Sequence, residues 1–150
     1  MTTQGRFRVI ATLVAVLGTW ASPLMAQDIG VRVGVSAEPN QFYFGADYET
    51  PPLVEQLHFR PNAEIGIGDE TTLTGLNFEF VYRFAGDYPW KLYGGAGPAL
   101  NFIDTDLDTK AEGGFNILFG AMHSDGLFVE VKAGALHSPR FKFGVGYLFR

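Results

Sequence analysis

His137 and Ser138 stand side by side near the end of the chain, and residues of these types can act as a base and a nucleophile. Such a pair works only when the two side chains lie within hydrogen-bond reach and a third group orients the base. Adjacent residues of a strand point to opposite faces, and no Glu follows the pair in the remaining sequence. We therefore expect no catalysis from these two residues.

Asp104, Asp106 and Asp108 have the spacing of the first ligands of a calcium-binding loop. Such a loop also needs glycine at its sixth position and glutamate at its twelfth, where this chain has Thr109 and Phe115. The segment is therefore predicted to be a solvated acidic hairpin. We expect neither a metal site nor a cofactor.

Charged residues recur at alternate positions of otherwise apolar segments. Counted over all eight segments, and with Glu49 and Lys91 included, these charged residues are six acids and six bases, so their charges balance. Such a face could line a path for solutes, or it could pair internally and fill the space. The residues predicted to form this lumen charge network are Arg32, Asp47, Arg60, Glu64, Glu79, Arg83, Glu112, Glu130, Lys132 and Lys142.

The segments that carry these charges show the period of a β-strand. In residues 57–67 the odd positions are apolar and the even positions are polar or glycine, so the two faces differ. Turn-forming residues separate such segments, and no segment has a convincing helical period. The pattern predicts an all-β chain with eight strands of about 9–11 residues, joined by connections of about 3–8 residues. The alternating segments are residues 29–36, 42–49, 57–67, 74–84, 91–102, 112–121, 127–134 and 140–149.

Eight antiparallel strands can close into a soluble barrel with an apolar interior or a membrane barrel with a polar one. Glycine, at 19 of 150 residues, exceeds its usual share of about 7%, and most glycines lie on the charged faces. An eight-stranded interior is just wide enough for side chains, so long charged residues need small neighbours there. The pattern favours an eight-stranded antiparallel up-and-down transmembrane β-barrel. The alternative is a soluble periplasmic lipocalin-like barrel that binds an apolar ligand.

Aromatic residues are expected to form girdles at the two membrane interfaces. Pro61 and Pro98 fall inside predicted strands, where each removes a ladder hydrogen bond, so we expect a bulge or a strand end near each. One predicted girdle comprises Tyr48, Phe84, Tyr88, Trp90, Tyr147 and Phe149, and the other comprises Phe42, Phe102, Phe115 and Phe141.

Residues 1–26 have the layout of a cleaved secretory signal peptide. Two arginines precede an apolar run of about 12 residues, which is too short for a membrane-spanning helix, and a stretch with small residues ends at Ala26. Cleavage is predicted after Ala26, with Ala21 as the alternative site and a retained N-terminal helix as the alternative structure. Residues 28–150 are predicted to form a single barrel domain.

The composition restricts the function. The chain has no cysteine, which excludes a disulfide scaffold, a zinc–thiolate site and a cysteine nucleophile. Its net charge is −5, and two of its bases lie in the predicted signal peptide, so the mature chain is more acidic still. Proteins that bind nucleic acid cluster Lys and Arg, so we expect no nucleic-acid partner.

Residues 59–68, 76–84 and 93–102 resemble segments of the family of small bacterial outer-membrane β-barrel proteins. The resemblance covers residues 28–150 and implies export to the cell outer membrane. It also implies contact with outer-membrane lipid and lipopolysaccharide, and with the barrel assembly machinery during biogenesis. Tyr147 and Phe149 are similar to the C-terminal assembly signal of such barrels, from which the chain departs by ending in Arg150.

This family shares no single activity, so the resemblance implies no reaction. Lipid A deacylases are similar eight-stranded barrels that use His, Ser and Glu, with the His and Ser one residue apart. His137 and Ser138 are adjacent instead, which leaves a deacylase as a distant alternative. We expect a monomeric outer-membrane barrel with a closed, salt-bridged lumen, a structural or surface-interaction role and no catalysis.

Overall fold

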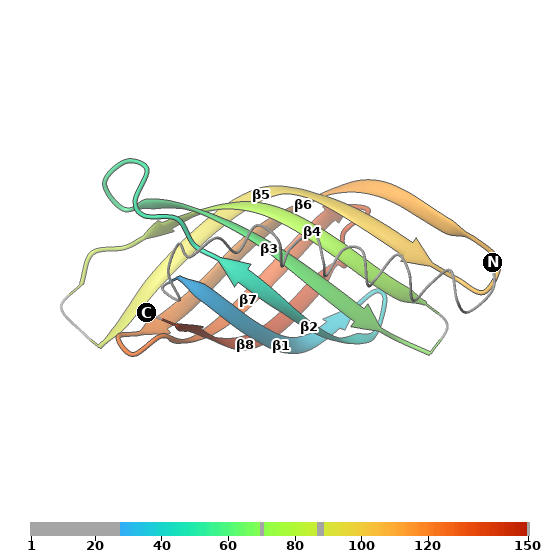
Figure 1. The fold of residues 1–150 in the computed structure, drawn as a ribbon, viewed down its shortest axis with the longest axis horizontal. Helices are drawn as coiled ribbons and strands as arrows, with labels where there is room; N and C mark the ends of the chain where they lie inside the picture. Colours follow the sequence, from blue (N-terminus) through green and yellow to red (C-terminus); the bar gives the residue numbers. More distant parts are fainter. Residues whose placement is uncertain (1–27, 70, 87–88, 150) are drawn as a thin grey trace.

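The chain forms a closed barrel of eight antiparallel strands in a computed structural model that describes residues 28–69, 71–86 and 89–149 (Figure 1). Each strand pairs with the next, and β8 closes the barrel against β1. The predicted all-β, up-and-down architecture is therefore confirmed. No helix in the described ranges is long and apolar enough to cross a membrane. The strands are β1 (Ile29–Ala37), β2 (Gln41–Tyr48), β3 (Leu57–Ile67), β4 (Thr72–Arg83), β5 (Trp90–Asp104), β6 (Thr109–His123), β7 (Leu127–Leu136) and β8 (Phe141–Phe149).

The antiparallel order sorts the connections between two ends of the barrel. We call the end where β1 begins and β8 ends the terminal end, and the other the distal end. All connections have three to eight residues, as predicted. The predicted signal peptide, residues 1–26, lies outside the described residues. Connections 49–56, 84–89 and 124–126 lie at the terminal end, and 38–40, 68–71, 105–108 and 137–140 lie at the distal end.

The β5–β6 hairpin is longer than the alternation predicts. Both strands have 15 residues, and their ladder continues to the pair Asp104↔Thr109. The β6–β7 ladder starts only at Gly114, so the hairpin projects beyond its neighbours at the distal end (Figure 1). Cross-strand pairing and a tight turn, in which Thr105 N–H donates to Asp108 O at 2.9 Å, hold this extension without an apolar face. Hydrophobic alternation could not detect it for that reason.

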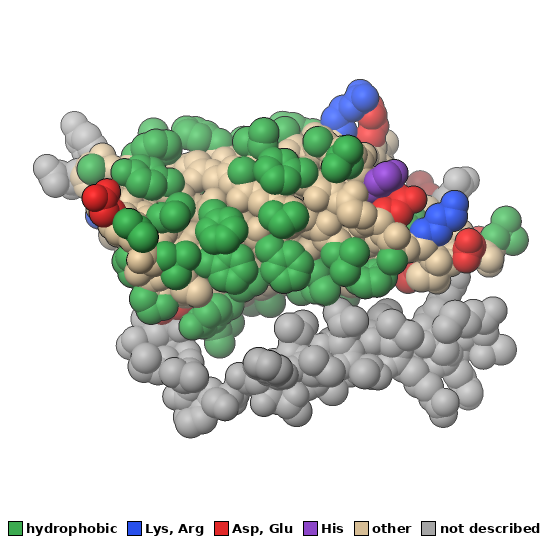
Figure 2. Space-filling view, turned by 90° about the horizontal axis from the view of Figure 1, so that it is seen from above, with side chains coloured by type: hydrophobic (Ala, Val, Ile, Leu, Met, Phe, Trp, Pro, Cys, Tyr) green, Lys and Arg blue, Asp and Glu red, His purple; other side chains and the backbone are tan. Residues whose placement is uncertain are grey.

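The barrel wall separates apolar from charged side chains. Outward-facing apolar residues such as Val33, Phe80 and Ile117 are between 43% and 60% exposed, and they cover the waist of the barrel. Figure 2 shows this apolar belt on one face, with the charged side chains at the two ends. The inward positions hold charged residues, asparagines, glycines and a few aromatic rings. The strand alternation predicted this division correctly.

Pro61 lies where β2 and β3 part. β3 runs through it without interruption, and the β3–β4 ladder includes the pair Pro61↔Phe78. On the other side of β3, the β2–β3 ladder has its last pair at Asn62, so it does not reach the adjacent Pro61. Phe59, which has the same parity, accepts a hydrogen bond from Thr50 on the β2 side, so the missing N–H of Pro61 faces that parted edge. What ends near Pro61 is therefore the pairing between β2 and β3, whereas the strand β3 itself continues.

Pro98 interrupts one ladder without a bulge or a strand end, so our expectation there is wrong. β5 continues through Pro98, and its pairing with β6 includes Pro98↔Phe115. The β4–β5 ladder omits the two positions opposite Phe78 and Glu79, and it resumes in the same register. At the neighbouring Gly97, a Cβ would meet the carbonyl oxygen of Phe78, so the two backbones approach closely there.

Candidate functional site

The interior of the barrel holds a compact set of ionised side chains, which we call the lumen cluster. Its members come from β1, β2, β3, β4, β7 and β8 and are all at most 4% exposed. Four are acids and four are bases. The cluster comprises Arg32, Asp47, Arg60, Glu64, Glu79, Glu130, Lys132 and Lys142.

Glu130 on β7 is one centre of the lumen cluster. Its Oε1 lies 3.0 Å from Arg32 Nη1 and 3.5 Å from Lys132 Nζ. Its Oε2 pairs with Arg60 and accepts a hydrogen bond of 2.7 Å from the hydroxyl of Tyr93. Side chains from four strands thus meet on one carboxylate, which ties opposite walls of the barrel together.

Glu64 on β3 is the second centre. Its Oε1 lies 3.2 Å from both Arg32 Nη1 and Lys132 Nζ, and its Oε2 pairs with Lys142. Lys132 also donates to Glu79 at 2.6 Å. Buried charges are strongly unfavourable unless each is compensated, and this lattice supplies compensating partners of opposite sign.

Three inward aromatic rings complete the cluster. The guanidinium of Arg60 lies 5.0 Å from the ring centroid of Tyr93, and that of Arg32 lies 5.4 Å from Phe128. Lys142 Nζ lies 5.2 Å from the ring of Tyr43. Such cation–π contacts add attraction in a dry interior. All three rings have the parity of the charged faces, and that signal could have assigned them to the lumen.

The inward glycines make room for these rings as much as for the charges. A Cβ at Gly34 or Gly144, which pair across β1 and β8, would meet the ring of Tyr43. A Cβ at Gly120 would meet Tyr93, and one at Gly146 would meet Phe128. Only some glycines border charged groups, such as Gly45 beside Glu64. Our interpretation that the glycines accommodate charges is therefore incomplete.

A row of asparagines extends the lumen cluster across β3, β4 and β6. Asn62 donates to Glu79 at 2.9 Å, Asn77 donates to Asn62 at 2.8 Å, and Asn116 donates to Asn77 at 2.8 Å. Each of these amides is at most 6% exposed. The row continues from Glu79 to β6, a strand that carries no member of the lumen cluster, and the predicted lumen charge network did not include it.

Two residues of the predicted lumen charge network, Arg83 and Glu112, lie at the barrel ends, outside the lumen cluster, as does Lys91 of the same alternating face. Arg83 lies at the terminal end, where it pairs with Glu49, and Lys91 is exposed there. Glu112 lies at the distal end, with Oε2 3.6 Å from His137 Nε2. Their alternation matches the inward face, but the strands reach the openings of the barrel before these positions.

The distal end is crossed by hydrogen bonds between connections. Gln41 Nε2 donates to Thr71 O at 3.1 Å, which joins the start of β2 to the β3–β4 turn. Asn101 Nδ2 donates to His137 O at 2.9 Å and to Ser138 Oγ at 3.3 Å, which joins β5 to the β7–β8 turn. These contacts fix two of the distal connections against neighbouring strands.

His137 and Ser138 are engaged by different groups. The Nδ1 of His137 lies 3.2 Å from Gly113 O and its Nε2 faces Glu112, while Ser138 Oγ accepts from Asn101. The ring nitrogens thus face other partners than the neighbouring hydroxyl.

The carboxylates of segment 104–108 bond within their own turn. Asp104 Oδ1 accepts from Thr109 Oγ1 at 2.5 Å, and Asp108 Oδ1 accepts from Thr109 N at 2.8 Å. Across the described ranges, no group of three or more metal-binding side chains is arranged to hold an ion.

Comparisons with known proteins place this geometry among solved barrels. The sequence matches no protein-family model and no curated protein. The structure is similar to Neisserial surface protein A, with a TM-score of 0.58, 15% identity, and coverage of 81% of this chain and 94% of that one. It is also similar to the outer membrane enzyme PagL, with a TM-score of 0.55, 16% identity, and coverage of 81% and 98%. The N-terminal β-barrel domain of Pseudomonas aeruginosa OprF gives a TM-score of 0.54, 13% identity, and coverage of 80% and 95%. The chain therefore has the fold of small eight-stranded outer-membrane barrels.

Proposed function

We propose that this protein is a monomeric outer-membrane barrel with a closed, salt-bridged lumen that serves as a structural or surface-interacting membrane body. One observation carries the proposal: the barrel turns its apolar side chains outward and its charges inward. Outward residues such as Val35, Phe42 and Ile117 are more than half exposed, whereas Arg60 and Glu79 are at most 1% exposed. Only a surrounding lipid phase makes that arrangement favourable.

The distribution of aromatic side chains supports a membrane setting. The exposed amphipathic rings of Tyr48, Tyr82, Trp90 and Tyr147 all lie at the terminal end of their strands. Phenylalanines occupy the distal end and also the waist, so two separate girdles do not describe the belt fully. Tyr and Trp favour the membrane–water interface because one edge is apolar and the other polar. Tyr88 of the predicted girdle lies outside the described residues.

The closed lumen is supported by the way its charges are used. The lumen cluster compensates four acids with four bases, and the asparagine row continues from Glu79 to β6. A solute path would need polar groups that face free space. Here the polar groups face each other in an interior that eight strands make only as wide as its side chains.

The alternative of a soluble lipocalin-like barrel needs an apolar interior for its ligand. The lumen cluster occupies that position here. A soluble barrel would also have to expose the whole apolar belt to water, far beyond the few hundred Å² that soluble monomers usually expose.

The absence of catalysis is the part of the proposal that the fold leaves open, because the similar PagL is an outer membrane enzyme. The local geometry supports a non-enzymatic role. His137 faces Gly113 and Glu112, while the hydroxyl of Ser138 accepts from Asn101. A nucleophile and its base would instead bond to each other.

Export by residues 1–26 and recognition of Tyr147 and Phe149 by the barrel assembly machinery remain parts of the proposal, as does contact with outer-membrane lipid and lipopolysaccharide. A terminal end in the periplasm would follow from this route.

Two measurements test the proposal together. The protein should fractionate with the outer membrane, require detergent for extraction and migrate faster on SDS gels before boiling than after. Reconstituted into planar bilayers, it should give no stable single-channel conductance. A detergent-free soluble monomer would overturn the membrane assignment, and discrete conductance steps would overturn the closed lumen.

A further inference from the structure

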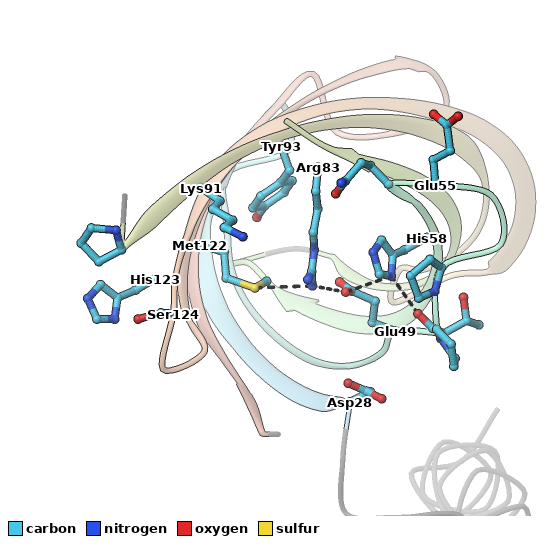
Figure 3. A pocket seen from close by; sticks show the side chains of 15 residues that line it. Asp28, Glu49, Glu55, His58, Arg83, Lys91, Tyr93, Met122, His123 and Ser124 are labelled. Atoms are coloured by element: carbon cyan, nitrogen blue, oxygen red, sulfur yellow. Dashed lines mark hydrogen bonds and ion pairs between the residues drawn. The ribbon is translucent and has the colours of Figure 1, made fainter. Parts of the chain in front are cut away.

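A cavity of about 640 Å³ lies at the terminal end of the barrel, where residues of the three terminal connections line it (Figure 3). We call it the vestibule. Its volume is in the range of sites for small molecules. Its lining includes the ionisable and sulfur-containing side chains of Asp28, Glu49, Glu55, His58, Arg83, Lys91 and Met122.

Glu49, directly after β2, lies at the centre of the vestibule wall (Figure 3). Glu49 is only 2% exposed. The two basic side chains beside it, Arg83 and His58, both approach the same carboxylate oxygen. Arg83 pairs with Oε1, and His58 Nδ1 lies 3.5 Å from that oxygen. Oε2 receives no hydrogen bond from any of the described residues.

The two side chains next to Glu49, His58 and Arg83, also contact other groups. His58 Nδ1 lies 2.9 Å from Thr50 O, and a carbonyl can only accept, so Nδ1 is the donor and is used there. Arg83 also donates to Met122 Sδ at 3.7 Å. A buried carboxylate oxygen without a donor is costly, because it has lost its water without replacement. The carboxylate of Glu49 therefore keeps one acceptor oxygen for which no described residue supplies a donor.

We propose that the vestibule binds a small aliphatic primary amine, whose ammonium group donates to Glu49 Oε2. Among the described residues that line the vestibule, three carboxylates, Asp28, Glu49 and Glu55, face the two cations Arg83 and Lys91, so this lining favours a cation. An ammonium has three N–H donors and forms strong charge-assisted bonds to a carboxylate. Pro51, Pro52 and Pro89 give the same cavity apolar walls for an alkyl chain.

The test is an NMR titration of the ¹⁵N-labelled, detergent-solubilised barrel with butylammonium. The amides of Glu49 and Lys91 should shift and saturate, whereas tetramethylammonium, which has the same charge but no N–H, should bind about tenfold more weakly or worse. Glu49→Gln should raise the Kd for butylammonium by about tenfold or more. Glu112→Gln, which removes a carboxylate at the distal end, should leave the Kd unchanged.

Lys91→Gln provides a second variant that does not remove the binding group. It takes a competing cation from the vestibule and should lower the Kd several-fold, so it decides the matter even if Glu49→Gln fails to assemble. Absence of saturable shifts in the wild type would show that solvent alone serves Oε2 and would overturn the proposal. So would equal binding of the two cations, equal binding by Glu49→Gln, or a Kd unaffected by Lys91→Gln.

Discussion

Glu130 shows how single residues hold this barrel closed. Arg32, Arg60, Tyr93 and Lys132 reach it from four different strands. Removing one member of a buried ion network leaves its partners uncompensated, which costs far more than the net contribution of an intact pair. The lumen cluster is therefore sensitive to loss of any one charge.

Glu130→Gln should lower the free energy of unfolding by about 3–5 kcal/mol, because three cations then face one carboxylate fewer. Equilibrium unfolding in urea, in detergent micelles, measures the change. The matched control is Glu38→Gln, whose exposed carboxylate lies 3.2 Å from Arg140. That surface pair should contribute less than about 1 kcal/mol. Equal effects in the two variants would contradict the role assigned to the lumen cluster.

Gly144→Ala should lower the free energy of unfolding by about 1–3 kcal/mol, because the new methyl group would overlap the ring of Tyr43 and overpack the lumen. Gly113→Ala is the control, since no atom lies within 4 Å of a Cβ built there. The same urea titration compares them. A neutral Gly144→Ala would show that Tyr43 can move aside freely.

At this scale the alternation indicates which face of a strand a charged residue lies on, but not which residue it pairs with. Parity placed Glu64 and Lys132 on one face, and the structure pairs them at 3.2 Å. Partner choice depends on strand register and barrel shear, which bring together residues separated by 68 positions and which no local pattern encodes. The vestibule was missed because Glu49 lies directly after the end of β2, where alternation no longer distinguishes lumen from opening.

The strands, as elements, differ in how much the alternation says about them. It located all eight, because each has one apolar and one polar face. It failed at the β5–β6 extension, which backbone pairing and a tight turn stabilise, and at Pro98, where the β4–β5 ladder has a local gap between two paired runs. The alternation of side chains therefore does not predict where backbone pairing between strands extends or is interrupted.

β8 is the element through which the proposed assembly signal acts. Tyr147→Ala and Phe149→Ala should each reduce the amount of folded barrel in the membrane several-fold, while the purified, refolded variants lose little stability. Phe141→Ala is the matched control, since Phe141 is equally exposed, at 48% against 47% for Phe149, but lies at the distal end of the same strand. Heat-modifiable migration of membrane fractions measures assembly. Equal losses from all three substitutions would point to belt contacts instead.

The whole molecule is defined by an apolar belt between two charged ends (Figure 2). Its acidity therefore belongs largely to the ends, because the lumen cluster is neutral as a set. In the proposed membrane setting the belt would fix the depth of the barrel in the bilayer, and its tolerance to charge should change steeply from the waist to the ends.

Ile117→Lys should destabilise the folded barrel by about 2–4 kcal/mol in lipid, because this residue of β6 is 60% exposed at the waist. Leu107→Lys, at the tip of the same hairpin, is the control, since Leu107 is 98% exposed beyond the wall. Unfolding titrations in lipid vesicles compare the two. Equal tolerance at both positions would argue against a surrounding membrane.

Trp90, at the terminal end of the barrel, provides a fluorescent probe of the protein's surroundings. The chain has two tryptophans, Trp20 and Trp90, and Trp20 falls within the predicted signal peptide. Cleavage as predicted would leave Trp90 as the single tryptophan, at the edge of the belt, with its ring 5.1 Å from that of His123. Its emission should shift to the blue on insertion, and lipids brominated near the headgroup should quench it more than those brominated at the chain ends. The fluorescence of Trp90 would therefore report the depth of the barrel in the bilayer without an added label.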